Sequence, residues 1–144
     1  MACDRAAALA LHAAAIVLAL AGCSGEIAPP LIRTGTPCAY CRMPAEDLHF
    51  ACERASDGAW KVYDAISCMM RDAPDVTARS AYLPDHERYR LHRADSMWVV
   101  HGEFQTPMPG GYAAFFERAE ADSFAAAHRG TVGTYRDFAR SIDR

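Results

Sequence analysis

The sequence predicts an α+β fold made of two small ββαβ-type modules in one compact unit. Segments in which apolar and polar residues alternate are typical of half-buried strands. Such segments come in pairs, and a short helical segment follows each pair. This strand–strand–helix order occurs twice, with residues 74–86 between the halves. The repeat is one of architecture, because the two halves share little sequence identity.

The first half begins with a predicted hairpin. LHFACERA (48–55) and AWKVYD (59–64) both alternate with a period of two, and Gly58 lies in the turn SDG between them, where a positive φ angle is needed. The next segment, AISCMMRDA, is expected to form a short helix that ends before Pro74. Asp64 is expected to cap the N-terminus of that helix.

The second half repeats the order. Residues 87–94 and 96–104 predict strands, since the second segment is rich in β-branched and aromatic side chains. YAAFF (112–116) is expected to be another strand, and 117–130 predicts a helix that stops at Gly130. The closing segment, TVGTYRDFARSI, is expected to be a strand or a short helix.

The start of the chain indicates export and lipid attachment. A mostly alanine, apolar run ends in Leu-Ala-Gly-Cys at residues 20–23, which is typical of a secretory signal too short to span a membrane comfortably. LAGC resembles the lipobox of bacterial lipoproteins, which implies removal of a signal peptide, residues 1–22, and acylation of Cys23. Ser24 after that cysteine favours the outer membrane, facing the periplasm. Residues 23–37, rich in Gly, Pro, Ser and Thr, then predict a lipid-anchored tether.

The mature chain is expected to hold a first ββα module at residues 38–75 and a second ββαβ module at 76–144. Signal removal takes away one acid and one base, so the formal net charge stays at −3. The chain has no basic tract in which aromatic residues interleave. Nucleic acid is therefore not an expected partner.

Four thiols remain after removal of the signal and acylation: Cys38, Cys41, Cys52 and Cys68. An oxidising envelope favours disulfides unless a metal or a reductant holds the thiols. Cys52 shares a predicted strand face with Leu48 and Phe50, which is typical of a small buried hydrophobe. Cys68 could face the sheet or the loop of residues 38–43, so a core role, a disulfide and a metal role stay open.

Cys38 and Cys41 form a C-x-x-C pair, which occurs in redox dithiols, zinc sites and haem attachment. Arg42 rather than histidine follows Cys41, and this excludes covalent haem. A structural zinc site needs four nitrogen or sulfur ligands, but the chain has no second C-x-x-C. A thioredoxin-type dithiol should follow a strand, whereas a Pro-rich tether precedes this motif. Neither zinc nor dithiol catalysis is favoured.

Met43 is a sulfur-containing residue that has no role in any of these interpretations. Soft thiolate and thioether ligands select Cu(I) over hard cations. On extended chain, Cys41 and Met43 project to the same side, so both can reach one metal. Met108, held between prolines in the loop TPMPG, is the candidate third ligand. Its alternative role is a gap-filler packed over the sheet edge.

Several motifs together resemble the NosL family, copper-binding accessory lipoproteins of nitrous oxide reductase. They are C-x-Y-C-x-M, YDAISCMMRD and WVVHGEFQTPMPGGYAAFFERAEADSFAAAHRGTVGTY, and the resemblance runs from about Pro37 to Tyr135. It implies ββαβ modules distantly like treble-clef metal-binding units. It also implies a periplasmic Cu(I) chaperone, not an enzyme, that supplies the reductase's copper–sulfide centre together with a membrane ABC-transporter complex. A homodimer sharing one copper stays open.

The resemblance carries the family's Cys-x-Met pair and its loop methionine onto this chain. With Cys38 as a candidate fourth ligand, the predicted Cu(I) ligands are Cys41, Met43, Met108 and Cys38. The chain departs from the family pattern at two positions. Arg42 stands where glycine is common, and Pro109 follows the loop methionine where glycine is usual. Both changes stiffen or crowd the predicted site.

Two alternatives make different predictions. An envelope thiol–disulfide oxidoreductase would use Cys38 and Cys41 equally, and Met43 and Met108 would matter little. A structural domain stapled by a Cys38–Cys41 or Cys38–Cys68 disulfide would have no metal affinity.

Overall fold

The computed structural model of the protein describes residues 28–75 and 77–142. The predicted signal peptide and Cys23 lie outside these residues. The elements in chain order are β1 (Thr36–Pro37), β2 (Pro44–Ala45), β3 (Cys52–Ser56), β4 (Ala59–Tyr63), α2 (Ile66–Asp72), β5 (Ala81–Pro84), β6 (Leu91–Arg93), a 3₁₀ turn η1 (Ala94–Ser96), β7 (Trp98–His101), β8 (Tyr112–Phe115), α3 (Arg118–Ala127), β9 (Thr131–Gly133) and α4 (Tyr135–Ser141). Helices and antiparallel sheets together confirm the α+β class.

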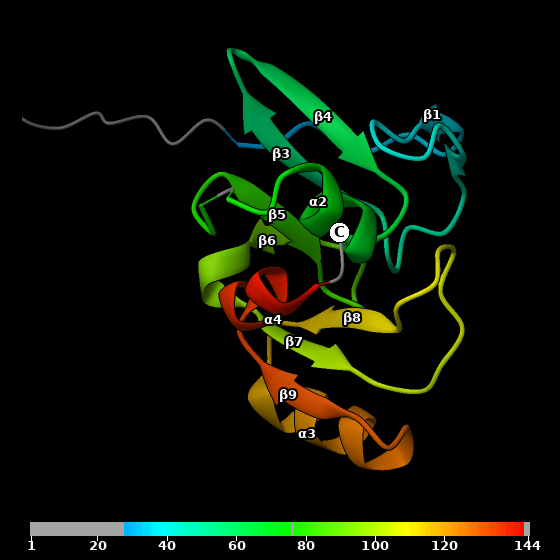
Figure 1. The fold of residues 1–144 in the computed structure, drawn as a ribbon, viewed down its shortest axis with the longest axis vertical. Helices are drawn as coiled ribbons and strands as arrows, with labels where there is room; N and C mark the ends of the chain where they lie inside the picture. Colours follow the sequence, from blue (N-terminus) through cyan, green and yellow to red (C-terminus); the bar gives the residue numbers. More distant parts are fainter. Residues whose placement is uncertain (1–27, 76, 143–144) are drawn as a thin grey trace, which may run out of the picture.

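Both halves of the chain form the same ββαβ arrangement (Figure 1). In the first half, β3 and β4 form an antiparallel hairpin, α2 follows, and β5 returns antiparallel beside β3. In the second half, β7, β8, α3 and β9 repeat this path, with β9 beside β7. The order β4-β3-β5 thus corresponds to β8-β7-β9. A repeated strand–strand–helix order is therefore present, but its second copy begins at β7, because the strand predicted at 87–94 is β6 and belongs to the first sheet.

The segment between the halves belongs to the first sheet. Residues 74–86, predicted as a connection, contain β5, in which every residue is buried. Strand β6 pairs with β5 and extends this sheet to the order β4-β3-β5-β6. The predicted module boundary between residues 75 and 76 therefore does not coincide with a boundary between sheets. The strand was missed because AYLP is short and ends in proline, which is unfavourable within a sheet.

Two predicted strands start later than expected because aspartates turn the chain. The carboxylate of Asp47 accepts a hydrogen bond from the His49 N–H. The backbone carbonyl of Asp47 accepts hydrogen bonds from the N–H groups of Phe50 and Ala51. Strand β3 consequently begins at Cys52 rather than at residue 48. The carbonyl of Asp85 accepts bonds in the same manner, and β6 begins only at Leu91.

The closing segment forms both of its predicted alternatives, β9 followed by α4. The change of structure occurs at Thr134, whose hydroxyl accepts a hydrogen bond from the Asp137 N–H. The Asp137 carboxylate accepts one from the Thr134 N–H in return. This capping box satisfies backbone donors that would otherwise lack partners. It directs Tyr135 and Ala139 of α4 into the core.

One apolar cluster joins the two halves. It contains buried side chains from α2, α4 and both sheets, among them Cys52, Tyr63, Ile66, Met69, Met70, Leu83, Met97, Val99 and Tyr135. In Figure 1, α2 and α4 lie between the β3–β4 hairpin and strands β7 and β8. A smaller cluster packs α3 against β7 and β8. None of the helices in residues 28–75 and 77–142 has the length and apolarity that a membrane span needs.

Candidate metal centre

The Cys-x-x-Cys pair lies on a tight turn between two very short strands. Residues 36–37, predicted as the end of the tether, form β1 and pair antiparallel with β2. Inside this turn the Cys38 N–H donates to the Met43 carbonyl at 2.8 Å, and the Arg42 N–H donates to the Cys38 carbonyl at 3.1 Å. A further bond, from the Ala39 N–H to the Val62 carbonyl at 2.8 Å, attaches the turn to β4. We call residues 36–45 the knuckle.

Arg42 takes a left-handed backbone conformation in the knuckle, with φ of 68°. A residue with a Cβ adopts this region at a cost of about 1–2 kcal/mol, whereas glycine adopts it freely. The glycine that the NosL pattern has at this position would suit the turn. The side chain of Arg42 is exposed, so the strain lies in the backbone alone.

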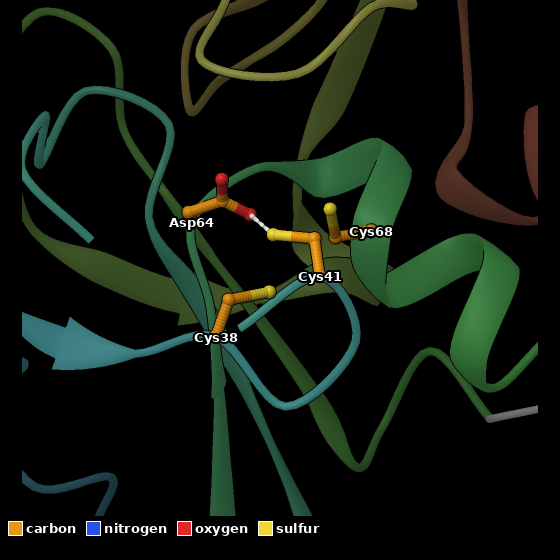
Figure 2. Close-up of side chains that lie close together, drawn as sticks. All are labelled: Cys38, Cys41, Asp64 and Cys68. Carbon is orange, nitrogen blue, oxygen red and sulfur yellow. Dashed lines mark hydrogen bonds between the residues drawn. The ribbon is translucent and has the colours of Figure 1, made fainter. Parts of the chain in front are cut away.

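Asp64 and Cys68 come from the junction of β4 and α2. The structure corrects one prediction here: Ala65 rather than Asp64 is the N-cap of α2, and no side chain caps the helix. The helix begins one residue later than expected. The Asp64 carboxylate instead accepts a hydrogen bond from the Cys41 thiol, with 3.5 Å between Sγ and Oδ1. Cys68 lies in the first turn of α2, facing the knuckle (Figure 2).

Four side chains therefore converge between the knuckle and the start of α2. They are Cys38, Cys41, Asp64 and Cys68, and we call them the thiol–carboxylate cluster. Their ligand atoms all lie within 4.8 Å of one another, and the side chains point toward a common space (Figure 2). Three members are buried, and only Cys41 is partly exposed. Three sulfurs and one carboxylate at this separation form a donor set that fits a metal ion.

The surroundings of Cys41 and Cys68 raise the pKa values of both thiols. Burial is the main cause that raises the pKa of Cys41, and a hydrogen bond with Cys38 and the nearby Asp64 add to it. Burial likewise raises the pKa of Cys68, together with its hydrogen bond to Asp64. A metal binds thiolates rather than thiols, so binding here has to release protons.

The two predicted thioether ligands lie in different surroundings. Met43 follows Cys41 by two residues, and its side chain is 56% exposed. Met108 is partly buried and packs against the apolar cluster that contains Cys38 and Cys68. Their role as ligands stays a prediction.

The loop of Met108 is attached to the helix that carries Cys68. The Arg71 guanidinium donates to the Pro109 carbonyl at 3.4 Å. Gly110 packs so closely that a Cβ there would lie 3.1 Å from the Cβ of Ser67. These contacts lie on both sides of Cys68 in the sequence. The methionine loop and the thiol–carboxylate cluster therefore share α2 as their support.

Cys52 lies in the core, as predicted, and is not a member of the cluster. The four cysteines of the described residues are free thiols, so neither predicted disulfide staple is formed. Sequence reasoning gave Asp64 a different role and left that of Cys68 open. Helical spacing gave no signal for this pair, because Asp64 precedes α2 and joins the cluster through its hydrogen bond with Cys41.

Comparison of the chain with protein-family models and with curated proteins found no match. The NosL resemblance therefore rests on the motifs of the sequence, and the geometry of the cluster is the structural observation on function.

Proposed function

We propose that the protein is a lipid-anchored, periplasm-facing Cu(I) metallochaperone rather than an enzyme. It delivers copper for the maturation of nitrous oxide reductase, directly or through the ABC-transporter complex of that pathway. The observation that carries the proposal is the convergence of three thiols, those of Cys38, Cys41 and Cys68, whose sulfur atoms lie within 4.8 Å of one another. Such soft sulfur ligands select Cu(I).

The distribution of exposure supports a path for the ion. Cys38 and Cys68 are fully buried, whereas Cys41 is partly exposed and Met43 is mostly exposed. Cu(I) arriving from solvent or from a partner meets Met43 first, then Cys41, then the buried thiols. Delivery reverses this order, because a partner's sulfur ligand can replace Met43 while Cys41 still holds the ion.

The Met108 loop supplies the second thioether. Its attachment to α2 through Pro109 and Gly110 keeps Met108 near the helix that carries Cys68. A thioether needs no deprotonation and does not form disulfides, so it keeps its affinity in an oxidising compartment. The loop methionine thus complements the thiols, because thiols that form a disulfide can no longer bind the metal.

A Cu(I) titration against a competing chelator, under anaerobic reducing conditions, tests the proposal with purified full-length protein. Changes in groups beyond the ligands themselves already cost about 10- to 100-fold in metal affinity. We therefore expect Cys41→Ser to weaken Cu(I) binding at least about 100-fold and Met108→Leu at least about tenfold. Matched controls are Cys52→Ala and Met97→Leu, whose side chains are buried outside the cluster. Unchanged affinity in Cys41→Ser would refute the proposal.

The oxidoreductase alternative fits the surroundings of the two thiols less well. Catalytic thiols in dithiol enzymes are accessible and have lowered pKa values. Cys38 is fully buried, and burial raises the pKa of Cys41. In the same titration, this alternative predicts equal effects of Cys38→Ser and Cys41→Ser and no effect of Met108→Leu.

A further inference from the structure

An apolar cavity of about 330 Å³ lies between residues 28–32 and the first sheet. We call residues 28–32, the segment APPLI, the strap. The opposite wall consists of Leu48 and Ala51 from the loop before β3, Pro84 of β5 and Leu91 of β6. The cavity shares no residue with the thiol–carboxylate cluster.

The cavity lies on the face of the first sheet that is opposite α2. Successive residues of a strand point to opposite faces. In β5, Leu83 packs in the apolar cluster that contains Cys68 of α2, so its neighbour Pro84 points to the other face, where it lines the cavity. Leu91 pairs directly with Pro84 and lines the cavity as well. The first sheet therefore separates the cavity from α2.

Two apolar side chains of the cavity wall are exposed to solvent. Leu31 of the strap is 93% exposed, and Tyr89, just before β6, is 55% exposed. Single exposed apolar residues are ordinary, whereas a group of them beside an apolar cavity marks an interaction site. Tyrosine is enriched where a membrane meets water, because its ring is apolar and its hydroxyl is polar. The wall thus presents side chains that fit the boundary between acyl chains and headgroups.

Two arginines at the same place add positive charge. Arg90 lines the cavity, and Arg33 directly follows the strap. Both are exposed, and neither forms a salt bridge within the part of the chain that the structure describes. By contrast, Arg88 is paired with Asp85 and Glu120. Arginines without acidic partners are available to the phosphates of anionic lipids, which attract basic side chains near a membrane surface.

The length of chain before the strap selects a bilayer as the occupant of this face. Cys23, the expected site of acylation, precedes Ala28 by five residues. Five residues span at most about 18 Å even when fully extended. Acyl chains on Cys23 insert into the bilayer, so the strap begins within that distance of the membrane surface. The face that carries the strap is therefore the one that the anchor brings against the lipid.

We propose that the strap, Tyr89 and Arg90 dock on the phospholipid bilayer, and we call them the strap face. Leu31 and the ring of Tyr89 enter the boundary of the acyl chains, while the Arg90 guanidinium contacts phosphate groups. Because the first sheet lies between the strap face and α2, docking turns the thiol–carboxylate cluster away from the membrane. Cys41 then stays accessible to a partner in the periplasm. The docking rests on the lipid anchor of the proposed function and does not depend on copper binding.

Quenching of tryptophan fluorescence by brominated lipids tests the docking, because bromine on an acyl chain quenches only at close range. The acylated protein is purified from membranes and reconstituted in vesicles of phosphatidylethanolamine and phosphatidylglycerol, with or without bromine on the acyl chains. Tyr89→Trp places the probe on the strap face, and Tyr40→Trp is the matched control on the knuckle, where Tyr40 is 45% exposed. The emission of the native protein, which has Trp60 and Trp98, is subtracted in each kind of vesicle.

We expect the added emission of Tyr89→Trp to be largely lost in brominated vesicles, and that of Tyr40→Trp to be unchanged. Equal emission of Tyr89→Trp in the two kinds of vesicle overturns the proposal. A blue shift of Tyr89→Trp without quenching also overturns it, because protein rather than lipid would then cover the face.

A charge on the strap provides the second measurement. Leu31→Glu, combined with Tyr89→Trp, should abolish most of the quenching, because a carboxylate does not enter the acyl region. Leu31 is almost fully exposed, so this change leaves the fold intact. Tyr40→Glu, combined with Tyr89→Trp, adds the same charge on the knuckle and should leave the quenching as it was. Full quenching in the Leu31→Glu protein would contradict the docking.

The failure of the docking and the failure of the chaperone give different results. Mass spectrometry of the purified protein detects the acyl chains on Cys23, and an unmodified Cys23 would overturn both the anchor and the docking. A protein that docks as described but binds no Cu(I) would keep this inference and refute the chaperone. Cu(I) binding by an acylated protein without quenching of Tyr89→Trp would do the opposite.

Discussion

Glu53 is a buried carboxylate that leads to a prediction on stability. It lies on β3 between Val62 of β4 and Tyr82 of β5, and its side chain is fully buried. Neither carboxylate oxygen has a hydrogen-bond partner among the described residues. Burial raises the pKa of Glu53 to about 7, from an ordinary value of 4.5. A charged, unpaired group at this position therefore destabilises the folded chain.

The pH window follows from these two values. Below about pH 4.5 the carboxyl is protonated in both the folded and the unfolded chain, so it adds no pH dependence. Between about pH 4.5 and 7 the unfolded chain ionises while the folded chain does not, and the free energy of unfolding falls as pH rises. The full loss, reached above pH 7, is at most about 3.4 kcal/mol at about 1.36 kcal/mol per pH unit. Water penetration and relaxation around the group reduce the expected loss to about 1–3 kcal/mol.

Glu53→Gln tests this reasoning, because it keeps the shape of the side chain and removes the charge. Urea unfolding at pH 5 and pH 8, in reducing and metal-free buffer, gives the change in the free energy of unfolding between the two conditions. The native protein should lose about 1–2.5 kcal/mol more of its free energy of unfolding between pH 5 and pH 8 than Glu53→Gln does. Glu46→Gln, at an exposed glutamate, is the matched control and should behave like the native protein. Equal pH dependence in Glu53→Gln and the native protein would refute the reasoning.

Three further predictions concern the knuckle and the loop. Arg42→Gly relieves the positive φ of 68° and should raise the free energy of unfolding by up to about 1 kcal/mol, measured by urea unfolding of the metal-free protein; a lower value would contradict the strain. Because burial raises the pKa of Cys41, metal binding has to displace protons, so Cu(I) affinity in the chelator titration should be higher at pH 8 than at pH 6.5. Equal affinities at the two pH values would show that the thiols are already ionised. Gly111 has a φ of 61°, and Gly111→Ala would place a Cβ against the carbonyl oxygen of Gly102. We expect this change to destabilise the protein by about 2 kcal/mol or more. We also expect it to weaken Cu(I) binding, because it displaces the Met108 loop. Thermal unfolding and the Cu(I) titration measure the two effects, and a native melting temperature would contradict the first.

The confirmed predictions rest on sequence patterns within single segments. The alternation in AWKVYD and the composition of YAAFF are properties of single segments, so the repeat of hairpin and helix was visible without tertiary information. Strand β5 was missed because its four residues are all buried and show no alternation. Its assignment depends on pairing with β3 and β6, which the segment itself does not encode.

Only one half of the candidate site could likewise be predicted from a local sequence pattern. The spacing of Cys38 and Cys41 on one turn is local, and it identified half of the thiol–carboxylate cluster. The other half comes from the junction of β4 and α2, and it meets the knuckle through a backbone bond between Ala39 and Val62. No spacing in the sequence encodes that bond. Asp64 therefore looked like a helix cap, which is the usual role of an aspartate before a helix.

The partial exposure of Cys41 is what makes a transfer function compatible with a buried cluster. A site with four buried ligands holds an ion firmly but offers no position at which a partner's ligand can enter. Cys41 is the member of the cluster with access to solvent, and Met43 lies exposed two residues beyond it. Stepwise exchange can therefore begin at this edge without unfolding the knuckle. If Cys41 were as buried as Cys38 and Cys68, the same four side chains would support a structural ion alone.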